Sequence, residues 1–280
     1  MKNIAESIKE IEEKSKTIEI TTEDLADFID HTELSPYATE NSLNGLCNEA
    51  KNFGFYSVCV HPFYAQFCAK KLEGTDVGTD VVVGFPLGQT TSEEKAFETE
   101  KAIEAGASEI DMVMNIGAFK DERYDLVKED IEAVVNASRE NTVKVIIETS
   151  YLTYEEITRA CELVKEAGAD FVKNGTGFGP YGANVPHIFF MRRAVGEDFG
   201  VKAAGGISDS RDALRMIAAG ANRIGTSSGV KIIESHKEEN PKNWRVEENP
   251  CPLCPSEMIS PDEVPDDVYQ YYKSKCESCE

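Results

Sequence analysis

Short, almost continuously apolar segments alternate with longer amphipathic segments through most of the chain. Eight of the short segments have the length and apolar composition of buried strands. They cover residues 28–32, 56–60, 80–84, 109–115, 143–148, 171–173, 201–203 and 223–225. Helical spacing is predicted between them, around residues 40–53, 62–72, 92–105, 121–138, 154–167, 184–195, 209–219 and 227–234. Strands that are apolar on both faces pair in parallel, with helical crossovers between them.

Eight strand–helix units within about 215 residues match the count and usual length of the (β/α)8 TIM barrel. An open, doubly wound sheet is the alternative architecture. Three predicted helices end in the same way, with Ala-Gly-Ala around Gly106, Gly168 and Gly220. Glycine there suits the left-handed residue that ends a helix before the next strand. The pattern therefore predicts an α/β barrel over residues 22–235.

Two further segments flank the predicted barrel. Residues 1–21 carry Ile4, Ile8 and Ile11 at helical spacing among charged residues, which predicts an N-terminal amphipathic helix. This helix would pack on the barrel or on a partner chain, or it would stay solvated. Residues 236–280 differ in composition, since they hold six of the eleven prolines and the only tryptophan. We predict that they form a separate C-terminal module.

The cysteines of residues 236–280 form two Cys-x2-Cys pairs, at Cys251, Cys254, Cys276 and Cys279. Their spacing is close to that of four-cysteine zinc sites, and a segment so small needs a staple to fold. We therefore predict a structural zinc, with disulfides, redox thiols or an iron–sulfur cluster as alternatives. Four thiolates would close the zinc coordination shell, so this metal would take no part in catalysis.

Charge and hydropathy narrow the class of protein. The formal net charge is −22, whereas a nucleic-acid-binding surface would need a basic stripe. No apolar run approaches the roughly 20 residues that cross a bilayer, so we expect no membrane partner. The N-terminus lacks the apolar core of a signal peptide, which predicts a cytoplasmic protein. An anionic substrate would have to be attracted by a local pocket and not by the overall field.

Two lysines and one aspartate are the candidate catalytic residues. Lys173 ends an apolar run and is followed by a glycine-rich turn, and Lys202 has a similar setting. Barrel strands carry reactive groups at their carboxyl ends, and a buried lysine beside a second cation is the nucleophile of Schiff-base chemistry. Asp111 is a lone carboxylate in an apolar strand, so it would face the lysines as a proton shuttle. Alternatively, the lysines only mark where strands meet water, and Asp111 is a purely structural ion-pair partner.

Two loops are candidates for a phosphate site. Residues 204–208 follow the seventh predicted strand, and residues 225–229 follow the eighth. Both lead into helices, where free backbone amides and the helix dipole favour an anion. The candidate substrate-binding residues in these loops are Gly205, Gly206, Gly225, Ser227 and Ser228. The other strand ends and loops add the candidate substrate-binding residues Asp30, Thr32, Cys59, Thr176 and Gly177.

Nine short motifs follow one another along residues 22–235. They are residues 29–32 (IDHT), 57–62 (SVCVHP), 84–88 (GFPLG), 95–98 (KAFE), 109–118 (EIDMVMNIGA), 144–149 (KVIIET), 169–173 (ADFVK), 201–206 (VKAAGG) and 223–228 (RIGTSS). In this order and combination the chain resembles the deoxyribose-phosphate aldolase family, which are class I, Schiff-base aldolases.

The resemblance implies a role for each candidate residue. Lys173 would form the Schiff base, Lys202 would be the cation that favours its uncharged amine, and Asp111 would relay protons through a water. The phosphate would be held by Gly205, Gly206, Ser227 and Ser228, and the pocket lined by Asp30 and Cys59. The implied reaction is reversible cleavage of 2-deoxy-D-ribose 5-phosphate to acetaldehyde and D-glyceraldehyde 3-phosphate, without a cofactor for catalysis. A homo-oligomer, either a dimer or a tetramer, is implied as well.

One stretch departs from the family pattern. The family usually has Thr-Ser-Thr after its lysine, whereas this chain has Asn174-Gly175-Thr176. Two hydroxyl-bearing side chains are therefore missing beside the proposed nucleophile. The departure keeps open a Schiff-base aldolase with different aldehyde partners. The N-terminal helix and the cysteine-rich tail keep open a third function, a non-catalytic barrel that acts as a scaffold or regulator.

Overall fold

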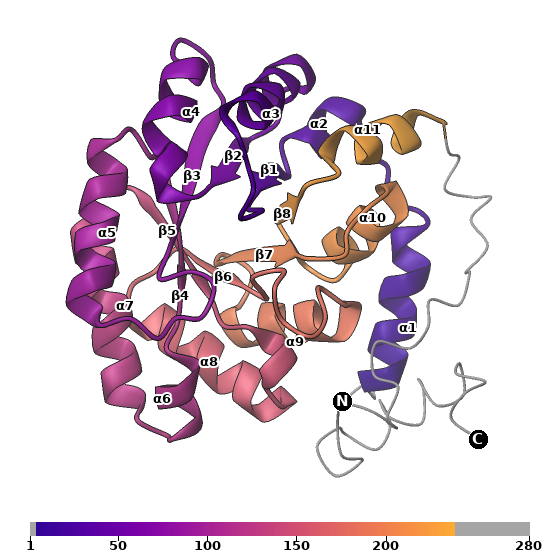
Figure 1. Ribbon diagram of the computed structural model, residues 1–280. Helices are drawn as coiled ribbons and strands as arrows, with labels where there is room; N and C mark the ends of the chain where they lie inside the picture. The colour runs from indigo at the N-terminus through magenta and orange to yellow at the C-terminus, as the bar shows by residue number, and fades with distance from the viewer. Residues whose placement is uncertain (1–3, 239–280) are drawn as a thin grey trace.

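The computed structural model describes residues 4–238, and its centre is a closed barrel of eight strands (Figure 1). The strands are β1 (Ile29–Glu33), β2 (Ser57–Val60), β3 (Gly78–Val83), β4 (Glu109–Val113), β5 (Thr142–Ile146), β6 (Phe171–Lys173), β7 (Gly200–Ala204) and β8 (Arg223–Thr226). Each strand pairs in parallel with the next, and β8 closes the ring on β1. The predicted TIM barrel is confirmed.

Helices surround the barrel and connect its strands (Figure 1). They are α1 (Ile4–Ser15), α2 (Thr22–Ala26), α3 (Glu40–Phe53), α4 (Ala65–Leu72), α5 (Ser92–Glu104), α6 (Ile116–Lys120), α7 (Tyr124–Ser138), α8 (Tyr154–Glu166), α9 (Val185–Val195), α10 (Ser210–Ala218) and α11 (Gly229–Glu238). Two 3-10 turns follow strands, η1 (Pro62–Tyr64) after β2 and η2 (Thr149–Tyr151) after β5. The helix ends predicted at Gly106, Gly168 and Gly220 are confirmed, with φ angles of 101°, 81° and 111°.

The connection between β4 and β5 differs from the prediction of one helix over residues 121–138. It contains two helices, α6 and α7. The side chain of Asn115 accepts a hydrogen bond from the Ala118 amide at 3.0 Å, and this cap starts α6 directly after β4. Residues 121–123 separate the two helices.

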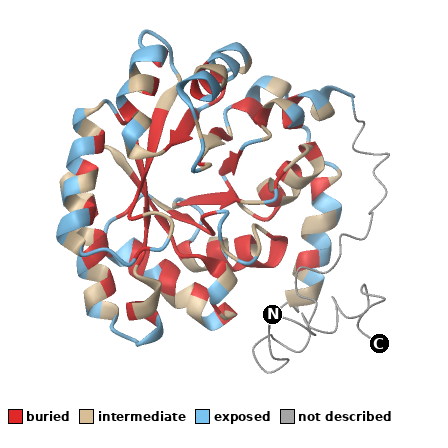
Figure 2. Ribbon diagram, viewed as in Figure 1, coloured by how far each residue is buried: buried red, intermediate tan, exposed pale blue. Residues whose placement is uncertain are grey.

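The strands are buried on both faces, as their apolar sequences predict (Figure 2). Every residue of β2, β4, β7 and β8 is buried. Helices cover the outer face, and side chains from the other strands fill the interior. A polar side chain that points into this interior therefore has only other side chains as partners, and its charge has to be matched there.

The N-terminal helix α1 lies against α10 on the outside of the barrel (Figure 1). Ile8 is fully buried, and Ile4 and Ile11 pack at the edge of the same core. Arg215 on α10 donates two hydrogen bonds to the Glu12 carboxylate, at 2.8 and 2.7 Å. Of the alternatives drawn from the sequence, packing on the barrel is the one observed.

Two further expectations concern the cysteine-rich C-terminal residues and membrane-spanning helices. The four cysteines expected to bind zinc, Cys251, Cys254, Cys276 and Cys279, lie outside the described residues. Across residues 4–238, none of the helices combines the length and apolar character that crossing a bilayer would need.

Candidate active site

The strand register brings the predicted catalytic residues to one level of the barrel interior. Lys173 is the last residue of β6, and it is the register partner of Lys202 in β7. Lys202 is the middle residue of its strand, so its predicted place at a strand end is wrong. The two lysines nevertheless lie side by side, because β6 is two residues shorter than β7. Both side chains are almost completely withdrawn from solvent, with Lys173 2% exposed and Lys202 0%.

Asp111 joins the two lysines. The Lys173 ammonium donates to its Oδ2 atom at 2.7 Å, and the Lys202 ammonium donates to the same oxygen at 2.8 Å. The two nitrogens therefore cannot be farther apart than the sum of these distances. Lysines that merely marked where strands meet water would be exposed and separate, so that alternative is excluded.

Three ammonium groups determine the charge state of Asp111. Burial raises the pKa of its carboxyl, but Lys144, Lys173 and Lys202 outweigh this effect and hold that pKa well below its usual range. The Lys144 nitrogen lies 2.9 Å from the second oxygen, Oδ1. Asp111 is thus a carboxylate at neutral pH, with a cation against each of its oxygens.

Lys202 contacts three carboxylates. Its nitrogen lies 2.5 Å from Asp30 Oδ2 and 2.8 Å from Asp80 Oδ2, in addition to the contact with Asp111. Burial lowers the pKa of this ammonium, but the three carboxylates raise it well above the ordinary lysine range. Lys202 therefore stays positively charged beside Lys173.

The interior charges extend to residues that the sequence analysis did not single out. Lys144 contacts Asp80, Glu109 and Asp111 at 3.2, 2.8 and 2.9 Å. Farther from the mouth, Arg223 contacts Asp30 at 2.9 Å and Glu109 at 3.0 Å. We call these eight side chains the interior charge network: Asp30, Asp80, Glu109, Asp111, Lys144, Lys173, Lys202 and Arg223. Four are acidic and four are basic, so the network is balanced when all are ionised.

The sequence does contain a signal for two of the missed residues. Asp80 and Lys144 are each the lone charged residue in an otherwise apolar strand centre, as Asp111 is. The argument applied to Asp111, that a charge inside an apolar strand needs a partner, applies equally to them. The sequence alone does not give the pairing, because it depends on which residues the register places at one level.

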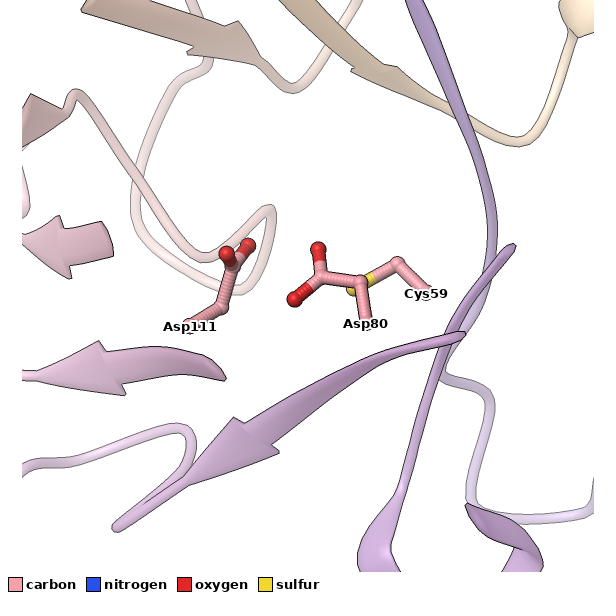
Figure 3. A group of neighbouring side chains, drawn as sticks. All are labelled: Cys59, Asp80 and Asp111. Atoms are coloured by element: carbon pink, nitrogen blue, oxygen red, sulfur yellow. The ribbon is translucent and has the colours of Figure 1, made fainter. Parts of the chain in front are cut away.

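Two clusters of three side chains in the barrel interior are close enough together to hold a metal ion. Cys59, Asp80 and Asp111 form one, with ligand atoms within 4.8 Å of one another (Figure 3). The other consists of Asp30, Asp80 and Glu109. The ammonium groups of Lys144 and Lys202 already lie between these carboxylates and supply the positive charge that a metal would bring. Burial, followed by the charge of Asp80, raises the pKa of the Cys59 thiol well above its usual range, so it is no ready ligand either.

The loop after β6 is held by a carboxylate from the segment that follows β5. Glu148 has a left-handed backbone with φ of 50°, and its Oε2 atom accepts hydrogen bonds from the Thr176 amide at 3.0 Å and the Thr176 hydroxyl at 2.5 Å. A Cβ atom on Gly175 would lie 2.9 Å from Glu148 Oε1, which explains why this position is glycine. The Thr176 hydroxyl is therefore directed at Glu148, while Gly177 beside it is exposed.

The two candidate phosphate loops are adjacent. The Thr226 hydroxyl donates to the Ile207 carbonyl at 2.7 Å and accepts from the Ser228 amide at 2.9 Å, which ties the loop after β8 to the loop after β7. Gly205 and Gly206 have left-handed φ angles of 90° and 75°, which glycine adopts without strain. Gly206 and Ser227 are exposed, and Gly205 and Ser228 are partly exposed.

Three of the predicted substrate-binding residues lie deeper or make other contacts. Gly225 is buried, and a Cβ there would lie 3.1 Å from Lys202 Cε, so its small size makes room for that lysine. Asp30 is fully buried, and Ser57, Lys202 and Arg223 engage both of its oxygens. Thr32 is partly exposed and donates to the Asp30 carbonyl at 2.9 Å. Asp30 and Gly225 thus contact Lys202 from the interior side.

Comparisons with known proteins place this fold in a family. A family model described as DeoC/LacD family aldolase matches residues 25–235. The chain is 59% identical to deoxyribose-phosphate aldolase of Clostridium tetani, over 75% of this chain and 98% of the relative. It is 57% identical to deoxyribose-phosphate aldolase of Thermococcus gammatolerans, over 75% of this chain and 96% of the relative. The tetrameric deoxyribose phosphate aldolase of Aeropyrum pernix superimposes with a TM-score of 0.77 at 34% identity, over 82% of this chain and 97% of that one.

Proposed function

Because the chain belongs to the DeoC/LacD family of aldolases, we propose that it cleaves 2-deoxy-D-ribose 5-phosphate reversibly to acetaldehyde and D-glyceraldehyde 3-phosphate. The protein is a carbon–carbon lyase, and the relatives compared above carry this activity in their names. The observation that supports the proposal best is the single Asp111 oxygen shared by the Lys173 and Lys202 ammonium groups. That arrangement brings a nucleophile, a fixed cation and a proton acceptor together in a dry site.

Lys173 is the nucleophile in this proposal. Its uncharged amine attacks the aldehyde carbon of the open-chain sugar, and loss of water from the adduct gives an iminium ion. The neighbouring Lys202 ammonium, which three carboxylates hold in its charged form, is the fixed cation beside this amine. Lys202 itself forms no bond to the substrate.

The iminium then accepts the electrons of the breaking carbon–carbon bond. The hydroxyl on the third sugar carbon loses its proton, the bond between the second and third carbons breaks, and glyceraldehyde 3-phosphate leaves with the new carbonyl. The remaining enamine takes a proton on its terminal carbon, and hydrolysis of the resulting iminium releases acetaldehyde. Asp111, which contacts the lysine nitrogen at 2.7 Å, is the group placed to manage these protons through a water.

The phosphate binds in the loops after β7 and β8. Gly205 and Gly206 present backbone amides there without side chains in the way, and Ser227 and Ser228 add hydroxyl groups ahead of α11. These loops adjoin the strand that carries Lys202, so a sugar phosphate bound here extends its aldehyde toward the lysine pair. The local amides supply the attraction that the overall charge of −22 does not.

Borohydride trapping tests the proposal directly. The protein is incubated with acetaldehyde and sodium borohydride, and the modified residue is located by peptide mass spectrometry. We expect one stable adduct on Lys173, and Lys173→Arg should remove it while Lys120→Arg, a change at an exposed lysine on α6, leaves it intact. Labelling elsewhere, or equal labelling of the Lys173→Arg variant, would refute the assignment. Rates of acetaldehyde addition to a panel of acceptor aldehydes then identify the preferred partner, which Asn174 and Gly175 leave open.

Residues 236–280 are proposed to bind a structural zinc through Cys251, Cys254, Cys276 and Cys279. Metal analysis of the purified full chain should find one zinc per chain. Replacing Cys251 and Cys254 with serine should remove it, whereas replacing the buried barrel cysteines should not. A metal-free chain whose four tail cysteines are present as disulfides would overturn this part of the proposal.

A homo-oligomer is also proposed, since the related protein of Aeropyrum pernix is described as tetrameric. Light scattering after size-exclusion chromatography measures the mass directly. A mass equal to the 30.9 kDa chain over the working concentration range would rule the oligomer out.

A further inference from the structure

Asn174 is the residue that departs from the family pattern directly after the proposed nucleophile, and its side chain is fully engaged. It is buried, and its amide group faces one residue of the neighbouring strand. Oδ1 accepts a hydrogen bond from the Ala204 amide at 2.7 Å, and Nδ2 donates to the Ala204 carbonyl at 3.2 Å. The carboxamide thus pairs with Ala204 in the way that a further peptide group of β6 would.

The backbone of Asn174 also forms hydrogen bonds, and these link β7 with the residues that follow β5. Its amide donates to the Lys202 carbonyl at 3.2 Å, and its own carbonyl accepts from the Thr149 amide at 2.7 Å. Asn174 therefore bonds with the end of β7 on one side and with the residues after β5 on the other. Its neighbour Lys173 is fixed between the same two strands.

Ala204 is the last residue before the Gly205–Gly206 loop, so its position fixes where that loop begins. Farther along the chain, the segment after β6 contacts the Gly205–Gly206 loop a second time, because the Ala183 amide donates to the Gly205 carbonyl at 3.0 Å. A Cβ atom on Gly182 would lie only 2.3 Å from that carbonyl oxygen. The chain that follows Lys173 is thus closely packed against the candidate phosphate loop at both of its ends.

We propose that Asn174 is a positioning residue that sets the placement of the Gly205–Gly206 loop relative to Lys173, and with it the preference for phosphorylated substrates. The inference rests on the proposed function and deepens it. A threonine at this position, as in the family pattern, would present a single hydroxyl oxygen where Asn174 presents a donor and an acceptor spaced like those of a peptide. The carboxamide therefore makes a two-point bond that threonine does not reproduce.

The test compares two substrates that share the same chemistry. The kcat/KM values for cleavage of 2-deoxyribose 5-phosphate and of unphosphorylated 2-deoxyribose are measured for the full chain and its variants. In Asn174→Ala the kcat/KM for the phosphorylated sugar divided by that for the unphosphorylated sugar should fall about tenfold or more. The reason is that a shift of the phosphate loop by about 1 Å misplaces the bound substrate, and misplacement of this size lowers catalysis by at least that factor. Trapping of acetaldehyde on Lys173 should persist, because it needs no phosphate.

A matched control exists at the other end of the same strand. Asn222 accepts a hydrogen bond from the Val201 amide at 2.7 Å through its Oδ1 atom, near the start of β7 and not at the end that leads into the Gly205–Gly206 loop. Asn222→Ala also removes an asparagine bond to β7, and its substrate ratio should stay within about twofold of the parent. Asn174→Thr serves as a second test variant if Asn174→Ala does not fold, and its ratio should fall as well.

The outcomes separate this inference from the proposed function. An unchanged ratio in folded Asn174→Ala or Asn174→Thr, including the case in which both substrates are cleaved more slowly to the same degree, would overturn the positioning role. A parent protein that acetaldehyde and borohydride do not label at Lys173 would instead refute the proposed function.

Discussion

Replacement of Asp111 with asparagine tests whether the interior charge network is as tightly coupled as its distances indicate. Asp111→Asn keeps the shape of the side chain and removes one of four negative charges. The three lysines that contact the carboxylate at 2.7 to 2.9 Å would remain buried, with one positive charge too many. The asparagine Nδ2 group would also be a donor facing an ammonium donor.

The size of the effect is bounded in two ways. Breaking a buried, hydrogen-bonded ion pair by removing one partner typically costs about 3–5 kcal/mol of stability. The excess charge can also be lost if one lysine gives up its proton, which for an ordinary lysine of pKa 10.4 costs about 4.6 kcal/mol at pH 7. The two figures agree, so we expect the free energy of unfolding to fall by about 3–5 kcal/mol, a large share of the roughly 5–15 kcal/mol of a typical domain.

The loss should depend on pH with a definite sign. The pKa of Asp111 is lowered in the folded state, so its contribution to stability is fully present above the unfolded value of about 3.9 and is lost as pH falls toward the folded value. The variant lacks this titration. The stability gap between parent and variant should therefore be constant from about pH 8 to pH 5 and narrow by roughly 1 kcal/mol at pH 3.

Urea unfolding followed by circular dichroism measures the gap at each pH, at one fixed protein concentration. Asp121→Asn, at an exposed position after α6, is the control for the change of residue type, and it should match the parent at every pH. A variant within about 1 kcal/mol of the parent at pH 7 would refute the reasoning. So would a gap that stays the same from pH 7 to pH 3.

Three further substitutions examine other parts of the site. Lys144→Met should lower kcat at least about tenfold with little change in KM, because it removes a cation from the network without touching the substrate, and steady-state kinetics on the sugar phosphate check this. Gly225→Ala should cost about 1–3 kcal/mol in urea unfolding and reduce kcat, since its Cβ would lie 3.1 Å from Lys202 Cε; unchanged values would contradict the tight packing. Glu148→Gln should lower stability by about 1–3 kcal/mol, because the Thr176 hydroxyl and amide lose a charged acceptor, and thermal or urea unfolding measures the loss.

The architecture could be predicted from the sequence because each of its signals is local. Apolar runs of strand length, amphipathic spacing and glycine after a helix all follow from the backbone and its immediate neighbours. The prediction was incomplete where a single side chain changed the local outcome, since the Asn115 cap starts the additional helix α6 ahead of α7, which corresponds to the helix expected over residues 121–138. Nothing in apolar spacing reports such a cap.

The site could be predicted in part. Lys173, Lys202 and Asp111 stood out because each is a charge in an apolar segment, and the structure places them in contact. The remainder of the interior charge network depends on strand register, which one sequence does not contain. Asn174 illustrates the same limit, since its sequence position suggested only a missing hydroxyl, whereas its contacts with Ala204 come from the neighbouring strand.

The balance of four acids and four bases bears on the order of the catalytic steps. An iminium ion on Lys173 carries the same positive charge as the resting ammonium, so Asp111 stabilises both at the contact that now measures 2.7 Å. The free amine and the enamine are neutral, and each leaves the interior charge network with one unmatched negative charge. That charge is costly in a buried site, because little solvent screens it. The proposed cycle therefore passes through its two nucleophilic states with a proton retained close by, and Asp111, which contacts the reacting nitrogen directly, is the group in the described residues best placed to exchange it.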